Sequence, residues 1–240
     1  VLDAGGMGAV CFSESKPSRD RAGFLTEATP VDGGFVLHGE KAFVLNADRA
    51  SLLLVFAQVD ASKGWDGLAA FIVDAKAEGV RVGAAVPTLG LNSVRSSTVQ
   101  LDGVKVSADA RVGGSGQELT RATLRFFAKE GLKNAARSVG LCQSALTTSL
   151  EYVSNRKAFG KPIGHFQAIA FTLADRSMDV DAARTLTWQA AARWDQHEAK
   201  PTSRSEKEAL LASAFAISFA LEAAMKAGDC AVQLHGGAGF

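Results

Sequence analysis

The sequence predicts an α+β protein, in which an antiparallel β domain of sandwich or barrel type is followed by an antiparallel helical bundle. Two observations carry this prediction. From residue 1 to about residue 114, short apolar runs alternate with turn residues, which is typical of strands joined by hairpins. Beyond Gly116, apolar residues recur with the 3.6-residue period of a helix. We therefore expect a β domain over residues 1–115 and a helical bundle over residues 116–240.

The strands of the β domain are predicted from its apolar runs. The turn residues Asp32, Gly33 and Gly34 directly precede the run FVLHG and mark a hairpin. The later runs are AFVL, SLLLVFAQV, LAAFIV, VRVGAAV and STVQLDGVKV. Many short strands separated by turns favour a sandwich or a barrel.

Three long helices are predicted for the second domain. The first carries an apolar stripe formed by Leu132, Ala135, Ala136, Val139, Leu146, Leu150 and Val153. The second runs from about His165 to Gln196, and a polar loop up to Arg204 separates it from the third. Ser205 and Glu208 have the spacing of a capping box at the start of the third helix, whose apolar run continues through Ala227. Long helices joined by short loops predict antiparallel neighbours.

The stretch RKAFGKPIGHFQAIAF interrupts this helical pattern at Gly160 and Pro162. One explanation is that Gly160 caps the preceding helix and that Arg156 opposes the negative end of the helix dipole. The other is a binding corner. A guanidinium at Arg156, a ring at Phe159 and an amide at Gln167 suit an anion attached to a flat ring system. The residues alone leave both explanations open.

Composition argues against several classes of protein. The chain has 26 basic and 25 acidic residues, so it has no electrostatic footprint for nucleic acid or an anionic membrane. The three cysteines, Cys11, Cys142 and Cys230, are widely spaced, which argues against a disulfide framework or a zinc site and favours a reducing compartment. The four histidines lack metal-ligand spacing. With 47% hydrophobic residues, no leader and no apolar run of transmembrane length, we expect a soluble globular protein with no membrane insertion.

Several segments that follow one another along the chain carry a family resemblance. They are CFSESKPS, DGGFVLHGEKAFVLNADRASLLLVFAQVD, TLGLNSVRSSTVQLDGVKVSADARVG, RKAFGKPIGHFQAIAFTLAD, AARTLTWQAA and AVQLHGGAGF. Together they cover nearly the whole sequence and resemble the middle and C-terminal domains of the acyl-CoA dehydrogenase family. Members of that family have a helical domain before the β domain and further helix after the GGAGF motif. We therefore expect this chain to hold the middle β domain and most of the C-terminal bundle only.

The resemblance implies a cofactor, FAD, bound between the β domain and the helical domain, with its adenosine diphosphate end reaching a neighbouring subunit of a dimer of dimers. By this likeness Arg156 would contact the diphosphate, and Phe159 would pack on the adenine side of the partner's flavin. The remaining residues assigned to the same shared flavin are Gln167, Gln233, Gly236 and Gly237. The break in the helical pattern would then be a cofactor platform at a subunit interface.

At the positions that would hold the isoalloxazine ring of FAD, this sequence departs from the family pattern. The family has a Thr-Glu-Pro triplet whose Thr binds the flavin pyrimidine edge, and we match it to the triplet from Ser15 to Pro17, which keeps a hydroxyl at Ser15. The loop that follows looks shortened, with Ser18 in the place of its serine. Phe43 stands where a Trp is usual and can still cover the flavin ring. Leu45 stands in place of a Thr near the reactive nitrogen and can form no hydrogen bond.

The chemistry implied by the resemblance is α,β-dehydrogenation of an acyl thioester. A carboxylate removes the α proton while the β hydrogen leaves as hydride to the flavin. Most members place this glutamate beyond the GG motif, outside this sequence. A minority place it ten residues before the glycine matched by Gly140, and that position is Glu130, although Gly131 replaces the Arg of the minority pattern. A solvated helical charge is the other interpretation of Glu130.

Three hypotheses for the function remain open. The first is an FAD-dependent acyl-CoA dehydrogenase, whose partners would be an acyl-CoA thioester, an electron-transfer flavoprotein or similar acceptor, and subunits of the same family. The second is a non-catalytic subunit of a hetero-oligomer, which the departures at Lys16, Leu45 and Gly131 favour. The third is a flavin oxidase or monooxygenase of the same fold. The expected compartment is the bacterial cytoplasm or, after removal of a targeting segment, the mitochondrial matrix.

Overall fold

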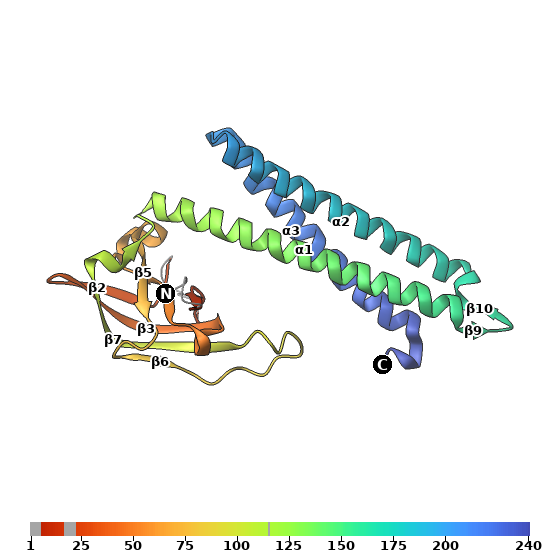
Figure 1. Cartoon of the computed structure of the whole chain (residues 1–240), viewed down its shortest axis with the longest axis horizontal. Helices are drawn as coiled ribbons and strands as arrows, with labels where there is room; N and C mark the ends of the chain where they lie inside the picture. The colour runs from red at the N-terminus through yellow and green to blue at the C-terminus, as the bar shows by residue number, and fades with distance from the viewer. Residues whose placement is uncertain (1–5, 17–22, 115) are drawn as a thin grey trace. The chain divides into compact units, whose positions relative to one another are not determined.

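The computed structural model describes residues 6–16, 23–114 and 116–240, and the internal contacts divide the chain into two compact units, Val1–Thr123 and Leu124–Phe240. Figure 1 shows strands in the first unit and long helices in the second. The strands are β1 (Gly8–Cys11), β2 (Glu27–Val31), β3 (Gly34–Leu45), β4 (Leu52–Gln58), β5 (Leu68–Asp74), β6 (Val80–Val82), β7 (Ser96–Ser107), β8 (Arg111–Val112), β9 (Lys157–Ala158) and β10 (Lys161–Pro162). The α-helices are α1 (Gln117–Asn155), α2 (Gln167–Ala199) and α3 (Ser203–His235). The predicted α+β class is confirmed.

The first unit is built on one eight-stranded sheet in the order β6-β7-β3-β2-β4-β5-β8, with β1 also paired to β4. Most strand pairs are antiparallel, as predicted, whereas β1 and β2 both run parallel to β4, so the sheet is mixed. The hairpin predicted at Asp32 to Gly34 joins β2 to β3, and Gly33 has φ +76. Two long strands, β3 and β7, pair along most of their length, with a register shift between Lys41 and Val44. This shift is a bulge that re-aims the side chains near it.

The core of the first unit consists of small and branched apolar residues from the inward faces of its strands. They include Leu37, Val44, Leu53, Val55, Phe71, Val73, Val99 and Val104. Along β3 and β7 these side chains partly alternate with more exposed ones, whereas much of β4 and β5 is buried on both faces. A separate cluster contains Phe24, Phe56, Leu68, Ala70 and Leu119.

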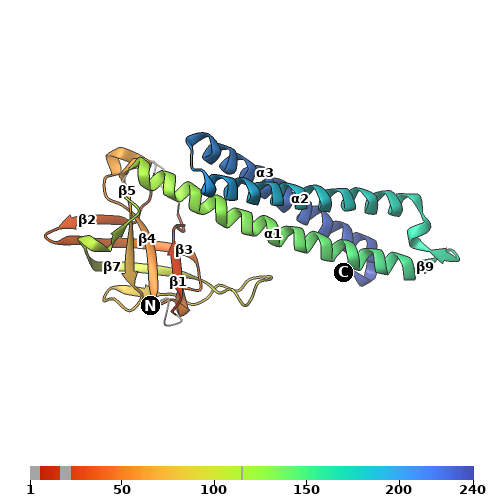
Figure 2. The same cartoon turned by 45° about the horizontal axis from the view of Figure 1, so that its top comes forward.

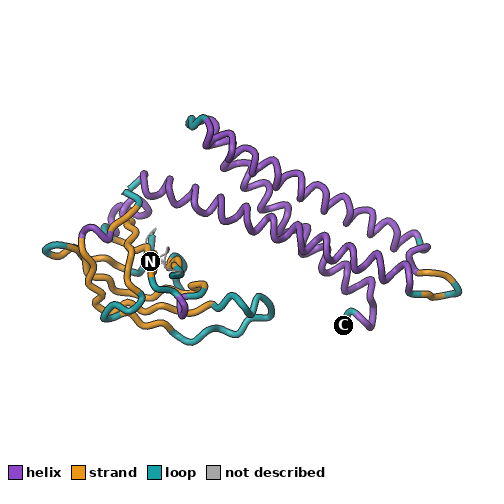
Figure 3. The backbone as a smooth tube through the Cα atoms, in the orientation of Figure 1, coloured by secondary structure: helices purple, strands orange, loops and turns teal. Residues whose placement is uncertain are grey.

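The second unit is a bundle of three antiparallel helices, which run side by side in Figure 2 and are separated by short non-helical segments in Figure 3. In the predicted stripe on α1, Ala135, Leu146 and Val153 are buried, whereas Leu150 is 46% exposed. The facing surface of α3 is a stripe of small residues formed by Ala209, Ser213, Ala216, Ala220, Ala223 and Ala227. Small side chains on a helix surface allow a neighbouring helix to approach closely.

The segment Ser203–Ala238 is long and apolar enough to cross a membrane by length and composition, with a hydropathy of 1.5. This differs from the sequence expectation that no apolar run has transmembrane length. The finding is weak by itself, because the core helix of a soluble protein passes the same test. Part of the small-residue stripe of α3, Ala216, Ala220, Ala223 and Ala227, lies in the bundle core with residues of α1 and α2, and 28% of the apolar window is buried.

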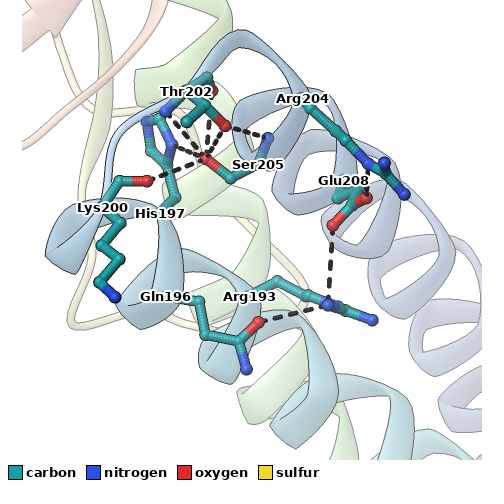
Figure 4. Close-up of polar contacts among 8 residues, drawn as sticks. All are labelled: Arg193, Gln196, His197, Lys200, Thr202, Arg204, Ser205 and Glu208. Atoms are coloured by element: carbon teal, nitrogen blue, oxygen red, sulfur yellow. Dashed lines mark hydrogen bonds and ion pairs between the residues drawn. The ribbon is translucent and has the colours of Figure 1, made fainter.

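The start of α3 differs from the prediction. The capping box is formed by Thr202 and Ser205, since the Thr202 hydroxyl accepts a hydrogen bond from the Ser205 backbone N at 3.0 Å and the Ser205 hydroxyl accepts one from the Thr202 backbone N at 3.1 Å. Glu208 instead accepts a hydrogen bond from Arg204 at 2.9 Å and lies 3.7 Å from Arg193 (Figure 4). The predicted loop from His197 is also too long, because α2 continues to Ala199.

Candidate functional site

Three segments of the chain meet at one end of the helical bundle: the end of α1, the β9–β10 hairpin and the end of α3 (Figures 1 and 2). The ring of Tyr152 on α1 stacks on the ring of His235 on α3, with centroids 4.2 Å apart. The Tyr152 hydroxyl also donates a hydrogen bond to the His235 carbonyl at 3.3 Å. These contacts bring the RKAFG segment and the HGGAGF segment, far apart in sequence, to the same end of the bundle.

The break in the helical pattern is a hairpin and not a glycine cap. Helix α1 ends at Asn155, and Ala158 then pairs with Lys161 across a two-residue turn formed by Phe159 and Gly160. Both turn residues have positive φ, 52° and 81°, as a type I′ turn requires. The explanation that Gly160 caps the helix is therefore wrong. The turn holds the Phe159 ring in solvent, where the residue is 97% exposed.

The predicted polar residues at this end are exposed and free to bind a ligand. The guanidinium of Arg156 makes no ion pair with any residue in the described part of the chain. Gln167 is the first residue of α2 and is exposed. Lys157 and Lys161 flank the turn, so the hairpin presents positive charge together with an aromatic ring. This combination suits an anion joined to a flat ring.

The end of α3 lines a cavity of about 600 Å³ that it shares with the start of α2. Gln233 lies in its wall, with Arg176, Lys226 and Cys230. Burial raises the pKa of the Cys230 thiol and Asp229 adds to this, against the opposing charge of Arg176, so this cysteine is not an activated nucleophile. Gly236 and Gly237 follow the helix, and a Cβ at either position would meet nothing within 4 Å. Only Gly236, with φ +55, has a backbone conformation that favours glycine.

In the β unit, Phe43 lies in the bulge of β3. Its φ is +55 and the residue is 66% exposed, so a second aromatic ring is held in solvent by a left-handed backbone. Leu45, two residues on, is also exposed and lies opposite Ser96 of β7 in the ladder. The buried hydroxyls of Ser96 and Ser97 have no hydrogen-bond partner among the described residues. Only Ser96 is paired with Leu45, since Ser97 is paired with Val44 on the buried face of the sheet. An unpaired hydroxyl such as that of Ser96 is the kind of group that a bound ligand satisfies.

The predicted flavin triplet begins at Ser15, whose hydroxyl donates a hydrogen bond to Glu40 at 2.7 Å. Pro17 and Ser18 lie outside the described residues. Ser13 is not among the residues predicted from the sequence. It is exposed, and its carbonyl accepts a hydrogen bond from the backbone N of Ala42 at 2.8 Å. This bond places Ser13 beside the residue that precedes Phe43. The signal available in the sequence was the alternation of Ser13, Glu14 and Ser15, which puts both serines on one face of an extended segment.

The structure does not bring Glu130 to the same end of the bundle as Arg156. Glu130 lies on α1 and Arg156 directly follows the end of that helix, so the two are roughly 40 Å apart at 1.5 Å per residue. Glu130 accepts a hydrogen bond from Lys133 at 2.5 Å, and its side chain is 41% exposed. Its neighbour Gly131 faces α3, where a Cβ would meet the end of the Ile217 side chain. Close packing of two helices therefore accounts for the glycine at that position.

Among the described residues there is no group of three or more histidine, cysteine or acidic side chains that could hold a metal ion.

Comparison with known proteins matches both units to one family. Residues 9–104 match the family described as acyl-CoA dehydrogenase, middle domain, and residues 120–240 match acyl-CoA dehydrogenase, C-terminal domain. Over 97% of its length the chain is 34% identical to a caffeyl-CoA reductase-Etf complex subunit of Acetobacterium woodii, covering 59% of that protein. It is also 34% identical to a probable short/branched chain specific acyl-CoA dehydrogenase of Dictyostelium discoideum, covering 100% of this chain and 56% of the relative.

Among solved structures, the butyryl-CoA dehydrogenase of Megasphaera elsdenii superposes with a TM-score of 0.86 at 32% identity, over 100% of this chain and 60% of that one. The chain therefore spans less than two thirds of the length of these relatives.

Proposed function

Because this chain belongs to the acyl-CoA dehydrogenase family, we propose that it forms part of an FAD-dependent oxidoreductase that acts on an acyl thioester. The family is one of flavoproteins. The finer reaction that we propose is the introduction of an α,β double bond. Bound FAD would supply the acceptor for the hydride that leaves the β carbon.

The observation that carries the proposal is the conformation of two aromatic residues. Of the described non-glycine residues, only Phe43, Asn46, Leu91 and Phe159 have positive φ. Both aromatic positions assigned to FAD are therefore in a strained conformation, and both expose their rings. The Phe159 ring makes one edge contact, with Phe166 at 6.3 Å between centroids. Strain at rings that remain largely exposed points to a ligand. The residues present fit FAD in this respect, and the unpaired hydroxyl of Ser96 supports the fit.

The chain's own groups would hold the cofactor at separate places. Arg156 would donate charge-assisted hydrogen bonds to the diphosphate, and Phe159 would cover the adenine. Gln167, Gln233 and the backbone of Gly236 and Gly237 would contact the same end. In the β unit, Phe43 would cover the ring system and a serine hydroxyl would hold its pyrimidine edge.

The separation between Arg156 and Glu130 supports an assembly of subunits of the same family. One FAD molecule is shorter than the roughly 40 Å of helix between them. The two residues would therefore serve different flavins, and a second copy or a sister subunit is needed to complete each site. Light scattering of the purified protein tests this, since a monomeric holoprotein would contradict it.

Two serines are candidates for the contact with the pyrimidine edge of the flavin, Ser13 and Ser15. Ser13 and Glu14 match the Thr-Glu of the family triplet at least as well as Ser15 and Lys16 do. The hydroxyl of Ser15 already donates to Glu40, whereas no hydrogen bond in the described part of the chain uses the hydroxyl of Ser13. Separate Ser13→Ala and Ser15→Ala variants should show which one weakens flavin binding.

The general base in this proposal is Glu130 or a glutamate outside this sequence. The test is formation of enoyl thioester from acyl-CoA with an artificial electron acceptor, by the purified protein and by its Glu130→Gln variant. A variant that retains flavin but loses turnover by about a hundredfold or more would support Glu130. Unchanged turnover would remove Glu130 and leave the base outside this sequence.

A second candidate function is a non-catalytic subunit that lends Arg156, Phe159 and Gln233 to a partner's flavin. Two observations favour it: Glu130 lies in a surface ion pair with Lys133, and Leu45 offers no hydrogen bond near the reactive end of the flavin. It predicts flavin retention only after co-expression with a sister subunit. Activity of the protein expressed alone would contradict it.

We further propose an electron-transfer flavoprotein as the electron acceptor, by analogy with the relative named as a subunit of a caffeyl-CoA reductase-Etf complex. The bacterial cytoplasm remains the proposed compartment, and cell fractionation would test it.

A further inference from the structure

A buried ion pair lies beneath the segment that carries Ser13 and Ser15. The side chain of Lys41 on β3 is 0% exposed, and that of its partner Glu14 is 6% exposed. The Lys41 Nζ atom lies 3.0 Å from a Glu14 carboxylate oxygen. None of the chemistry proposed above uses either charge.

Every strong interaction of the pair joins separate stretches of chain. Lys41 Nζ donates a hydrogen bond to the Phe12 carbonyl at 3.2 Å and lies 3.7 Å from the centroid of the Phe24 ring. The Glu14 carboxylate accepts hydrogen bonds from the backbone N of Leu25 at 2.7 Å and of Thr26 at 2.8 Å. The pair therefore ties the 12–14 and 24–26 segments to β3.

The same ties fix the segment relative to Phe43. Directly after Lys41, the backbone N of Ala42 donates to the Ser13 carbonyl, and Phe43 follows in the bulge. Glu14 points inward, so Ser13 and Ser15 on either side of it are exposed. The buried carboxylate thus determines which face the two hydroxyls occupy, beside the exposed ring of Phe43.

Stability alone is a weak reason to bury two charges here. Replacing a buried ion pair by apolar residues of similar size is often neutral or stabilising, because desolvation offsets the attraction. A fully hydrogen-bonded pair does fix geometry, since any other arrangement leaves a charge unpaired in the interior.

We propose that Lys41 and Glu14 are a positioning pair that holds the Ser13–Ser15 edge beside Phe43 for contact with FAD. This inference rests on the proposed function. Neither residue touches the cofactor in this proposal. Both would influence the affinity for FAD and the environment of the bound flavin.

The test compares two variants that each remove a cation from a buried carboxylate. Lys41→Met removes the partner of Glu14 in the β unit. Arg125→Met removes a partner of Glu206 in the helical bundle, where Glu206 is 4% exposed. Both variants should lose thermal stability. FAD affinity is measured by flavin fluorescence quenching well below both melting midpoints, and the visible absorption band of the bound flavin is recorded.

The expected result is that Lys41→Met weakens FAD binding about tenfold or more and shifts the flavin band, while Arg125→Met changes affinity by less than about twofold. If Lys41→Met does not accumulate as folded protein, Glu14→Gln, which keeps the length of the side chain, is measured in its place with the same expectation.

Equal effects of the two variants on FAD affinity, or an unchanged flavin band in Lys41→Met, would overturn the positioning role while leaving the proposed function intact. A wild-type protein that does not bind FAD would overturn the proposed function and this inference with it.

Discussion

Phe159 pays a conformational cost for its exposed position. A left-handed backbone disfavours a residue with a Cβ by roughly 1–2 kcal/mol, and the ring gains no burial in return, because it is 97% exposed. Phe43 in the β unit also has a left-handed backbone, and it is 66% exposed. The sequence indicated both residues by their type, but it could not indicate the strain. Phe-Gly is not a usual pair for a two-residue hairpin, where Asn-Gly is preferred.

Phe159→Asn should therefore stabilise the apoprotein and weaken FAD binding. Asn tolerates the left-handed conformation, so we expect a gain of about 0.5–1 kcal/mol in the free energy of unfolding. Loss of the ring should raise the FAD dissociation constant by about tenfold, in line with the contribution of an aromatic contact. Urea unfolding and flavin titration measure the two effects. An unchanged affinity would show that Phe159 does not contact FAD.

The buried position of Lys41 leads us to expect an unusual dependence of the free energy of unfolding on pH. Burial lowers the pKa of Lys41 from 10.5 to about 8, although the charge of Glu14 opposes the shift. Between these two pH values the unfolded chain binds more protons than the folded one, so this residue makes the free energy of unfolding rise with pH. The measurement is urea unfolding of the wild type and of Lys41→Met across that window. The wild type should gain stability relative to the variant as pH rises. If the difference in unfolding free energy between wild type and variant stays constant or falls, Lys41 does not carry a buried charge with a lowered pKa.

The three helices were predictable from their apolar period, whereas their ends were not. Thr202 with Ser205 and Ser205 with Glu208 share the same spacing, so pattern alone could not choose the capping box. In the structure Thr202 is the N-cap residue, because α3 begins at Ser203. Likewise, the parallel pairing of β1 with β4 could not be predicted, because the apolar pattern of a strand does not name its partner.

The observed cap makes a prediction for two adjacent residues. Thr202→Ala removes the acceptor for the Ser205 backbone N and should cost about 1 kcal/mol of unfolding free energy. Ser203→Ala is the matched control, since it changes an exposed residue in the first turn and should cost less than about 0.5 kcal/mol. Urea unfolding of both variants gives the comparison. Equal costs would place the cap at a different residue.

Across the whole chain, the candidate FAD residues fall into two groups, one in each unit. Arg156, Phe159, Gln167, Gln233, Gly236 and Gly237 lie at one end of the helical bundle, and Ser15 and Phe43 lie in the β unit. The gathering of the first group follows from helix lengths and from the Tyr152–His235 contact. The contact could not be read from the sequence, where Gln233 follows Arg156 by 77 residues. The resemblance to the family supplied that grouping instead.

Removing FAD should lower the melting midpoint of the protein, because a ligand that binds only the folded state stabilises it. At a free FAD concentration about a hundred times the dissociation constant, the gain is about 2.7 kcal/mol. Arg156→Gln should show a smaller FAD-dependent shift. Arg204→Gln, which changes an exposed arginine at the start of α3, should show the wild-type shift. Differential scanning fluorimetry with and without FAD measures all three, and equal shifts would contradict the role of Arg156.

The most direct measurement is the visible absorption spectrum of the purified protein, recorded anaerobically before and after addition of a panel of acyl-CoAs. The proposed function predicts an oxidised flavin band that at least one acyl-CoA bleaches, with formation of the enoyl thioester. A protein that purifies without flavin and cannot be reconstituted with FAD, or a bound flavin that no acyl-CoA in the panel reduces, would contradict it.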